Sequence, residues 1–334
     1  MKNLSDIAQA MVASSKGILA ADESTGTIKK RFDSIKVEST EDNRRDYREL
    51  LFTAPNISNY ISGVILYDET IRQNASNGKP LREILLSQNI IPGIKVDMGA
   101  VDLAQHPGEK ITEGLDGLRE RLAEYASFGA QFTKWRAVIT IGRDIPTDYC
   151  IKTNADALTR YAALSQEAGL VPMVEPETLM DHDQGIEVCN QVTLKTLNAL
   201  FEELRAADVD TKGLILKVNM VLPGKNSQRQ VSDEEVAKQT LNVLRNTVPA
   251  DVPGIVFLSG GQSDEQAISR LNAINVLAKS SSSDFPWQIS FSYGRGLQAA
   301  ALKAWVGKKE NVAKAQKVFM QVAEKTSKAR DGGL

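Results

Sequence analysis

Eight short apolar runs, separated by segments with helical spacing, constrain the fold of this chain more than any other feature. The runs lie at residues 17–22, 61–67, 91–97, 131–140, 170–177, 214–220, 254–260 and 287–293. Continuous apolar runs of this length are typical of parallel strands that are covered on both faces. The segments between the runs, for example 115–128, 193–204 and 232–248, repeat apolar residues along one helical face.

Strands that alternate with helices eight times predict an α/β protein with a (β/α)8 TIM-barrel fold. An open doubly wound sheet is the alternative. We expect a single domain with these parts: an N-terminal helix at 1–16, the barrel at 17–305, and a C-terminal helix with a short tail at 306–334. Ser232 with Glu235, and Ser263 with Gln266, have the spacing of a capping box and predict two helix starts.

Composition excludes several classes of partner. The chain has 334 residues and a formal net charge of −2, which gives no reason to expect nucleic acid or an anionic membrane as a partner. Two cysteines, Cys150 and Cys189, make no disulfide framework, as is usual for a reduced compartment. We expect a cytoplasmic protein, because the first 15 residues lack a signal-peptide core and no apolar run is long enough to span a membrane.

Ionisable residues fall late in five of the predicted strands. They are Asp22, Lys95, Lys134, Glu175 and Lys217. Since side chains alternate along a strand, each lies on the same face as the apolar residues two and four positions before it. The carboxyl ends of barrel strands carry the active site, so these charges should converge at one mouth.

Lys217 lies in the apolar run 214–220, where an ionised lysine is costly to bury. Burial close to Lys134 should favour its neutral amine, which is a nucleophile that forms Schiff bases with carbonyls. Glu175 is the natural acid–base partner. We expect burial to raise its pKa towards neutrality.

Two glycine-containing loops suggest phosphate sites. Gly260 and Gly261 follow the seventh strand and precede a helix capped by Ser263, and Gly294 and Arg295 follow the eighth. Barrels commonly bind phosphate there, with backbone N–H groups and a helix N-terminus. The run "GRGLQA" also fits a dinucleotide fingerprint, but it lies at the last strand, with no later strand to supply the ribose-binding acid.

Metal sites have little support in the sequence. The two histidines, His106 and His182, form no metal-binding motif. The run "DHDQG" at 181–185 follows the fifth strand, and a solvated loop is the favoured interpretation.

Seven motifs, in order along the chain, resemble those of class I fructose-1,6-bisphosphate aldolases. They are "LAADESTGTIKKR", "GIKVD", "KWR", "VEPE", "LKVNM", "FLSGGQS" and "FSYGR". The resemblance implies a (β/α)8 barrel and a cytoplasmic enzyme of glycolysis and gluconeogenesis, usually a homotetramer. Its reaction would be the reversible cleavage of fructose 1,6-bisphosphate to dihydroxyacetone phosphate and glyceraldehyde 3-phosphate through a lysine Schiff base, with no metal and no cofactor.

The resemblance also assigns roles to residues. Lys217 looks like the Schiff-base lysine, and Glu175, with Glu177 close by, like the acid that helps water to leave. Asp22 would engage the hydroxyl on carbon four, and Lys134 would stabilise charge beside it. For the phosphate on carbon one, the residues are Ser259, Gly260, Gly261, Ser292, Gly294 and Arg295. For the sugar and the other phosphate, they are Ser24, Thr27, Arg31, Lys95 and Arg136.

The chain departs from the family at three points. Val218 stands where proline is usual and Thr27 where serine is common, and neither change should disturb the site. The run "ARDGGL" also differs from the tail of animal members, whose terminal tyrosine assists proton transfer. The alternatives are another Schiff-base lyase, such as a transaldolase or a keto-acid aldolase, and a scaffold that keeps the fold without the chemistry.

Overall fold

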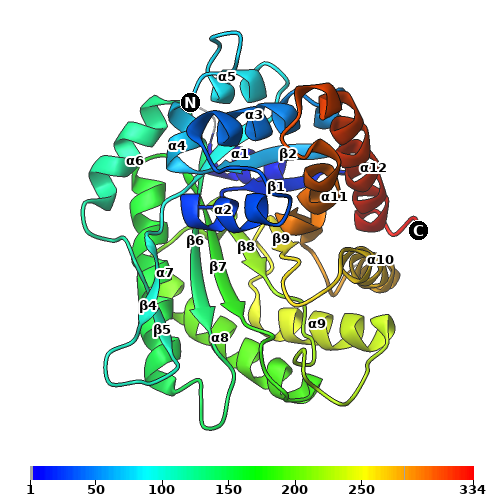
Figure 1. The fold of residues 1–334 in the computed structure, drawn as a ribbon. Helices are drawn as coiled ribbons and strands as arrows, with labels where there is room; N and C mark the ends of the chain where they lie inside the picture. The colour runs from blue at the N-terminus through cyan, green and yellow to red at the C-terminus, as the bar shows by residue number, and fades with distance from the viewer. Residues whose placement is uncertain (1–2, 282) are drawn as a thin grey trace.

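The computed structural model describes residues 3–281 and 283–334. Its eight parallel barrel strands are β1 (Gly17–Ala21), β2 (Ile61–Leu66), β3 (Ile91–Lys95), β6 (Phe132–Ile139), β7 (Val171–Thr178), β8 (Ile215–Val218), β9 (Gly254–Phe257) and β10 (Gln288–Tyr293). They close in the order β1–β10–β9–β8–β7–β6–β3–β2 (Figure 1). The (β/α)8 barrel is confirmed, and the open doubly wound sheet is wrong.

The interior of the barrel is filled by the faces that sequence parity predicted. Ile18, Phe132, Met173 and Ile215 belong to one buried cluster, and each lies two residues before an ionisable residue or, for Ile18, four before one. Gly93 shares this interior, and a Cβ atom there would lie 2.3 Å from the Phe132 ring. Apolar side chains therefore fill the barrel below, and charged ones lie at its carboxyl end.

Helices surround the strands and bury a second, larger apolar cluster between themselves and the sheet. Within the described residues they are α1 (Leu4–Met11), α2 (Thr25–Asp33), α3 (Glu41–Phe52), α4 (Asp68–Arg72), α5 (Leu81–Leu86), α6 (Leu118–Ser127), α7 (Asp148–Glu167), α8 (Ile186–Ala206), α9 (Asp233–Thr247), α10 (Asp264–Ser280), α11 (Arg295–Trp305) and α12 (Val312–Arg330). Short 3-10 turns occur at η1 (Ile57–Asn59), η2 (Thr211–Gly213) and η3 (Lys309–Asn311). None of these helices is long and apolar enough to cross a membrane.

The amino end of the barrel is closed by α1, which falls within the predicted segment 1–16. Met11 and Val12 pack into the interior cluster, and Val12 lies against Gly254 at the start of β9. The C-terminal helix α12 reaches the same end, where the Arg330 guanidinium donates to the Val12 carbonyl at 3.2 Å. Residues 1 and 2 of the predicted helix lie outside the described residues.

A hairpin that the sequence did not reveal follows β3. Its strands, β4 (Gly99–Asp102) and β5 (Lys110–Glu113), pair antiparallel with Asp102 opposite Lys110. Three of the four residues in β4 are exposed, so the segment lacks the apolar run by which the barrel strands were recognised.

One of the two predicted capping boxes is complete. Ser263 and Gln266 exchange side-chain and backbone hydrogen bonds at the start of α10. At α9, Ser232 accepts from the Glu235 N–H, but the Glu235 carboxylate accepts from Arg229 instead of returning to the cap. The prediction of a second capping box was therefore only half right. The bond from the Glu235 side chain to the cap is missing, because the Arg229 guanidinium lies within reach of that carboxylate.

Candidate active site

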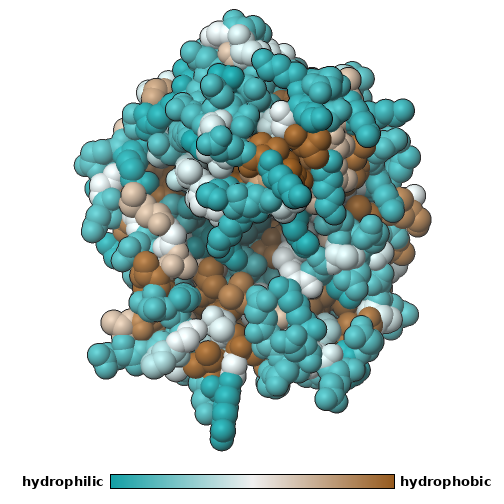
Figure 2. All heavy atoms as spheres, in the orientation of Figure 1, coloured by the Kyte–Doolittle hydropathy of each residue, from teal (hydrophilic) through white to brown (hydrophobic). Residues whose placement is uncertain are grey.

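A cavity of about 770 Å³ opens at the carboxyl ends of the barrel strands. Of the predicted site residues, all but Glu175, Gly261 and Arg295 line it. Figure 2 shows the face of the molecule on which α2 lies. This face is mostly hydrophilic and is hollowed near its centre. The five late-strand charges thus meet at one mouth, as their positions predicted.

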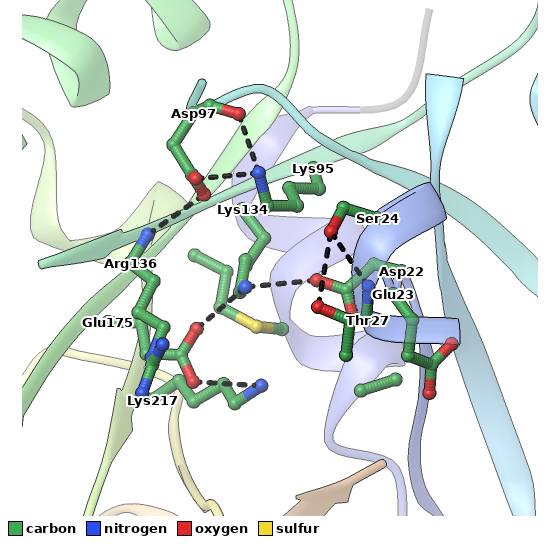
Figure 3. A network of polar contacts seen from close by, with 12 residues as sticks. Asp22, Glu23, Ser24, Thr27, Lys95, Asp97, Lys134, Arg136, Glu175 and Lys217 are labelled. Carbon is green, nitrogen blue, oxygen red and sulfur yellow. Dashed lines mark hydrogen bonds and ion pairs between the residues drawn. The ribbon is translucent and has the colours of Figure 1, made fainter. Parts of the chain in front are cut away.

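Four charges, three of them buried and that of Asp22 partly buried, form a continuous chain across the base of this cavity (Figure 3). Lys217 Nζ lies 3.0 Å from Glu175 Oε1, and Lys134 Nζ lies 3.0 Å from Glu175 Oε2. Lys134 also donates to Asp22 Oδ2 at 2.9 Å. Lys217 is therefore not an isolated buried cation. Glu175 contacts both lysines while contributing no wall of the cavity.

The two carboxyl groups among these four charges, those of Glu175 and Asp22, are held ionised. Burial alone raises the pKa of Glu175, but Lys134, Lys217 and Arg136 outweigh burial, so the pKa is lowered. The predicted rise was wrong, because it counted burial without the two lysines. The pKa of Asp22 is likewise lowered, since Lys134 and Lys217 outweigh its burial.

Lys134 is held protonated. Its burial lowers the pKa of the ammonium group, but Asp22 and Glu175 have the larger effect and raise it. Only 6% of the Lys134 side chain is exposed, so solvent has little access to compete with the two carboxylates. Lys134 is therefore a fixed positive charge between two carboxylates.

A second pair of cations lies nearer the mouth. Lys95 Nζ is 2.6 Å from Asp97 Oδ1, and the Arg136 guanidinium pairs with Glu177. Burial lowers the pKa of Arg136, but Glu177 more than reverses this and raises it. Asp97 was not recognised in the sequence, although it lies two residues after Lys95 and so on the same face.

Helix α2 lines one wall. Ser24 caps it by accepting from the Thr27 N–H, and the two hydroxyl oxygens lie 3.1 Å apart. Thr27 therefore keeps the contact that a serine would make. Arg31, one turn further on, lines the cavity and pairs with Glu23, which the sequence reasoning also missed.

The loops after β9 and β10 supply the adjoining wall, since β10 lies beside β1 in the barrel. Ser259, Gly260, Ser292 and Gly294 line the cavity. Ser292 Oγ is buried and has no hydrogen-bond partner among the described residues, which suits a ligand oxygen. Glycine at these positions lets backbone N–H groups approach an anion closely.

Two predicted phosphate residues face elsewhere. Gly261 has a φ of 77°, and a Cβ atom on it would lie 2.6 Å from Met180 Cγ. Arg295 is exposed at the start of α11 and donates to the Gln262 carbonyl at 2.6 Å. Gly261 thus serves the turn that presents Gly260, and Arg295 fixes the loop before α10.

The segment 181–185 is only partly the solvated loop that we expected. Asp181 is exposed and pairs with Lys225 at 2.7 Å, but His182 is buried, and its Nδ1 accepts from the Gln184 N–H. Burial lowers the pKa of His182. No group of three or more histidines, cysteines or acids suited to a metal ion occurs within residues 3–281 and 283–334.

The last tyrosine and the chain end lie away from the mouth. The Tyr293 hydroxyl is buried and donates to the Ala267 carbonyl at 2.9 Å. The Leu334 N–H donates to Asn272 Oδ1 on α10 at 3.0 Å. Val218, beside Lys217, continues β8 opposite Phe257, as a β-branched residue should.

Comparisons with known proteins agree on one family. The family model described as "Glycolytic: Fructose-bisphosphate aldolase class-I" matches residues 3–334. A probable fructose-bisphosphate aldolase class 1 of Xanthomonas campestris pv. campestris is 55% identical over 333 residues, which is 99% of this chain and 98% of that protein. The cytosolic fructose-bisphosphate aldolase 4 of Arabidopsis thaliana is 52% identical over 95% of this chain and 80% of its own length. A solved structure of fructose-bisphosphate aldolase from Plasmodium falciparum, in complex with TRAP and a small-molecule inhibitor, has a TM-score of 0.96 at 49% identity. That match covers 99% of this chain and 94% of the other.

Proposed function

This chain belongs to the class-I fructose-bisphosphate aldolase family, and on that premise we propose that Lys217 is the lysine that attacks the sugar. The reaction of the family is the reversible cleavage of fructose 1,6-bisphosphate through a lysine Schiff base. The observation that supports Lys217 most is its contact with Glu175, 3.0 Å away and 3% exposed. Lys134 contacts the same carboxylate but also pairs with Asp22, whereas Glu175 is the one ion-pair partner of Lys217 among the described residues.

Imine formation needs one proton to move between Lys217 and Glu175. Transfer from the ammonium to the carboxylate leaves a neutral amine, which attacks carbon two of the sugar, and proton transfer to the oxygen gives a carbinolamine. Glu175 then returns its proton to the carbinolamine hydroxyl, water leaves, and a protonated imine remains. The lowered pKa of Glu175 favours the second of these transfers, in which the acid returns to a carboxylate, and opposes the first, in which the carboxylate takes the proton of Lys217.

Cleavage of the bond between carbon three and carbon four uses the other end of the chain. Asp22 takes the proton of the hydroxyl on carbon four as that carbon becomes an aldehyde. The electrons of the broken bond move into the protonated imine and give an enamine. Lys134, at 2.9 Å, holds Asp22 ionised until this step.

Two sets of cavity residues are suited to bind the two phosphate groups of the sugar. We assign the phosphate on carbon one to Ser259, Gly260, Ser292 and Gly294, whose loops combine backbone donors with a buried hydroxyl. We assign the other phosphate and the sugar hydroxyls to a second set, which is Ser24, Thr27, Arg31, Lys95 and Arg136. Gly261 and Arg295 support the first loop without facing the cavity.

Borohydride trapping tests the assignment. The protein is incubated with dihydroxyacetone phosphate and borohydride, with a chelator present, and the adduct is located by peptide mass mapping. We expect an irreversible adduct on Lys217 and none in a Lys217→Arg variant. An adduct confined to Lys134 or Lys95 would overturn the assignment.

Assembly and location are separate proposals. We propose a homotetramer in the cytoplasm. The proposal is supported by the usual assembly of family members as homotetramers and by plant relatives that are named as cytosolic or cytoplasmic. Size-exclusion chromatography with light scattering measures the first. A mass near four chains of 36.5 kDa is expected, and a monomer mass would refute it.

A further inference from the structure

Asp22 and Glu23 follow β1 as neighbours, but their carboxylates point in different directions. Asp22 is directed at Lys134, whereas Glu23 is directed away from the charge chain (Figure 3). Only 8% of Glu23 is exposed, so its charge needs partners inside the protein.

Three helices supply those partners. Arg48 on α3 places Nη2 2.8 Å from Glu23 Oε2. Gln298 on α11 donates to Glu23 Oε1 at 2.9 Å and to the Ala20 carbonyl at 2.7 Å. Arg31 on α2 donates its Nη1 to the same Oε1. We call these four residues, Glu23, Arg31, Arg48 and Gln298, the Glu23 cluster.

Only two members of the cluster reach the cavity. Arg48 and Gln298 do not line it, and the Arg48 side chain is 3% exposed. Glu23 and Arg31 line it, and Arg31 is the more exposed of the two, with 24% of its side chain accessible. The buried members thus fix Glu23 from behind, and Glu23 holds Arg31 at the edge of the cavity.

The part of Arg31 left free faces the site. Arg31 Nη2 lies 3.7 Å from the position that a Cβ atom on Gly294 would occupy. Because Nη1 is used by Glu23, Nη2 and Nε remain as donors, and a guanidinium fixed at one nitrogen holds the others in its plane. An arginine free to rotate would lose this alignment and would have to be ordered on each binding event.

We infer that Glu23 is a positioning residue: through Arg31, it sets the affinity of the site for a substrate phosphate. Arg48 and Gln298 serve the same end, since they fix Glu23 from α3 and α11 without lining the cavity themselves. This inference rests on the proposed role of Arg31 in phosphate binding. It adds a second layer of residues that acts only through Arg31.

Steady-state kinetics with fructose 1,6-bisphosphate test it. We expect Arg31→Ala to raise KM about tenfold, the loss expected for one charge-assisted hydrogen bond. Glu23→Gln should raise KM about three- to tenfold and change kcat less than twofold. The double variant should match Arg31→Ala alone, because Glu23 acts only through Arg31.

Controls separate positioning from stability. Glu69→Gln breaks a partly buried ion pair with Arg44 on α3, neither residue of which lines the cavity, and should leave KM and kcat unchanged. If Glu23→Gln folds poorly, Glu23→Gln with Arg48→Met removes the buried unpaired cation and keeps the KM test available. In that background too, KM should rise and kcat should hold.

Three results would overturn the inference. The first is multiplicative effects in the double variant, which would mean that Glu23 acts independently of Arg31. The second is a fall in kcat at constant KM, which would place its effect on the chemistry of Asp22. The third is no effect of Arg31→Ala on KM. Borohydride trapping at Lys217 is independent of all three, so it shows whether the aldolase assignment fails as well.

Discussion

Replacing Lys134 by methionine removes the cation shared by the Asp22 and Glu175 carboxylates while keeping much of the side-chain volume. Asp22 loses a partner at 2.9 Å and Glu175 loses one at 3.0 Å. Glu175 keeps Lys217, but Asp22 is left without a contacting cation in the described structure. The variant therefore acts mainly on the charge of Asp22.

The size of the effect follows from the geometry. Two unit charges 2.9 Å apart attract by roughly 6 kcal/mol at an effective dielectric constant of about 20. Burial opposes that gain in part, and an opposite charge in contact usually lowers the pKa of a carboxyl by about 1–3 pH units. Since Asp22 loses its contacting cation while its burial remains, we expect its pKa to rise by about three pH units in the variant, equivalent to about 4 kcal/mol.

The sign of the pH effect is fixed by this shift. In the folded wild type, the Asp22 carboxyl has a pKa below its value of about 4 in an unfolded chain. Asp22 is therefore ionised at every pH above about 4. In Lys134→Met, kcat/KM should therefore gain an acidic limb at about pH 4–5. At neutral pH, kcat should fall about 100- to 1,000-fold, since the base also loses its electrostatic support.

The assay is a pH profile of kcat/KM, with fructose 1,6-bisphosphate cleavage followed by a coupled assay. Lys95→Met is the matched comparison, because Lys95 contacts Asp97 and has the smallest of the cited effects on Asp22. It should weaken activity without moving the acidic limb. If Lys134→Met lost activity while its profile stayed flat to pH 4, the argument that Lys134 sets the charge of Asp22 would be refuted.

Three further predictions follow from single contacts. Glu175→Gln should lower kcat by about 100- to 10,000-fold in single-turnover assays, because the amide has no proton to return to the carbinolamine; a loss below tenfold would contradict its role. Gly93→Ala should destabilise the fold by about 1–3 kcal/mol in urea melts, because its Cβ atom would lie 2.3 Å from the Phe132 ring, and an unchanged midpoint would contradict this. Burial raises the pKa of the thiols to about 12 for Cys150 and about 11 for Cys189, so a thiol reagent at pH 8 should label neither until the protein unfolds; rapid native labelling would show that the cysteines are accessible.

Strand parity explains why so much of the site was predictable. Lys95, Lys134, Glu175 and Lys217 each lie two residues after a member of the barrel interior, so alternation alone placed them above the core. The same rule places Asp97, the last residue of the run 91–97, on the face of Lys95, although no role was predicted for it.

The sequence alone does not show which distant residues contact a buried charged side chain, or which of their effects on its pKa is the largest. The pKa of Glu175 depends on two lysines from other strands, and no local pattern states which of the two effects, burial or attraction, is larger. Glu23 shows the same limit, since its partners lie on three helices, the most distant 275 residues away along the chain. Contacts of that kind exist only once the barrel closes.

The chain from Lys217 through Glu175 and Lys134 to Asp22 contains two cations and two anions, so it is neutral as a whole. A proton that moves from Lys217 to Glu175 leaves that total unchanged. The proton used to expel water is therefore carried by the enzyme from the start and need not be drawn from solution. Imine formation at this site should proceed at a rate that does not depend on the concentration of an external buffer.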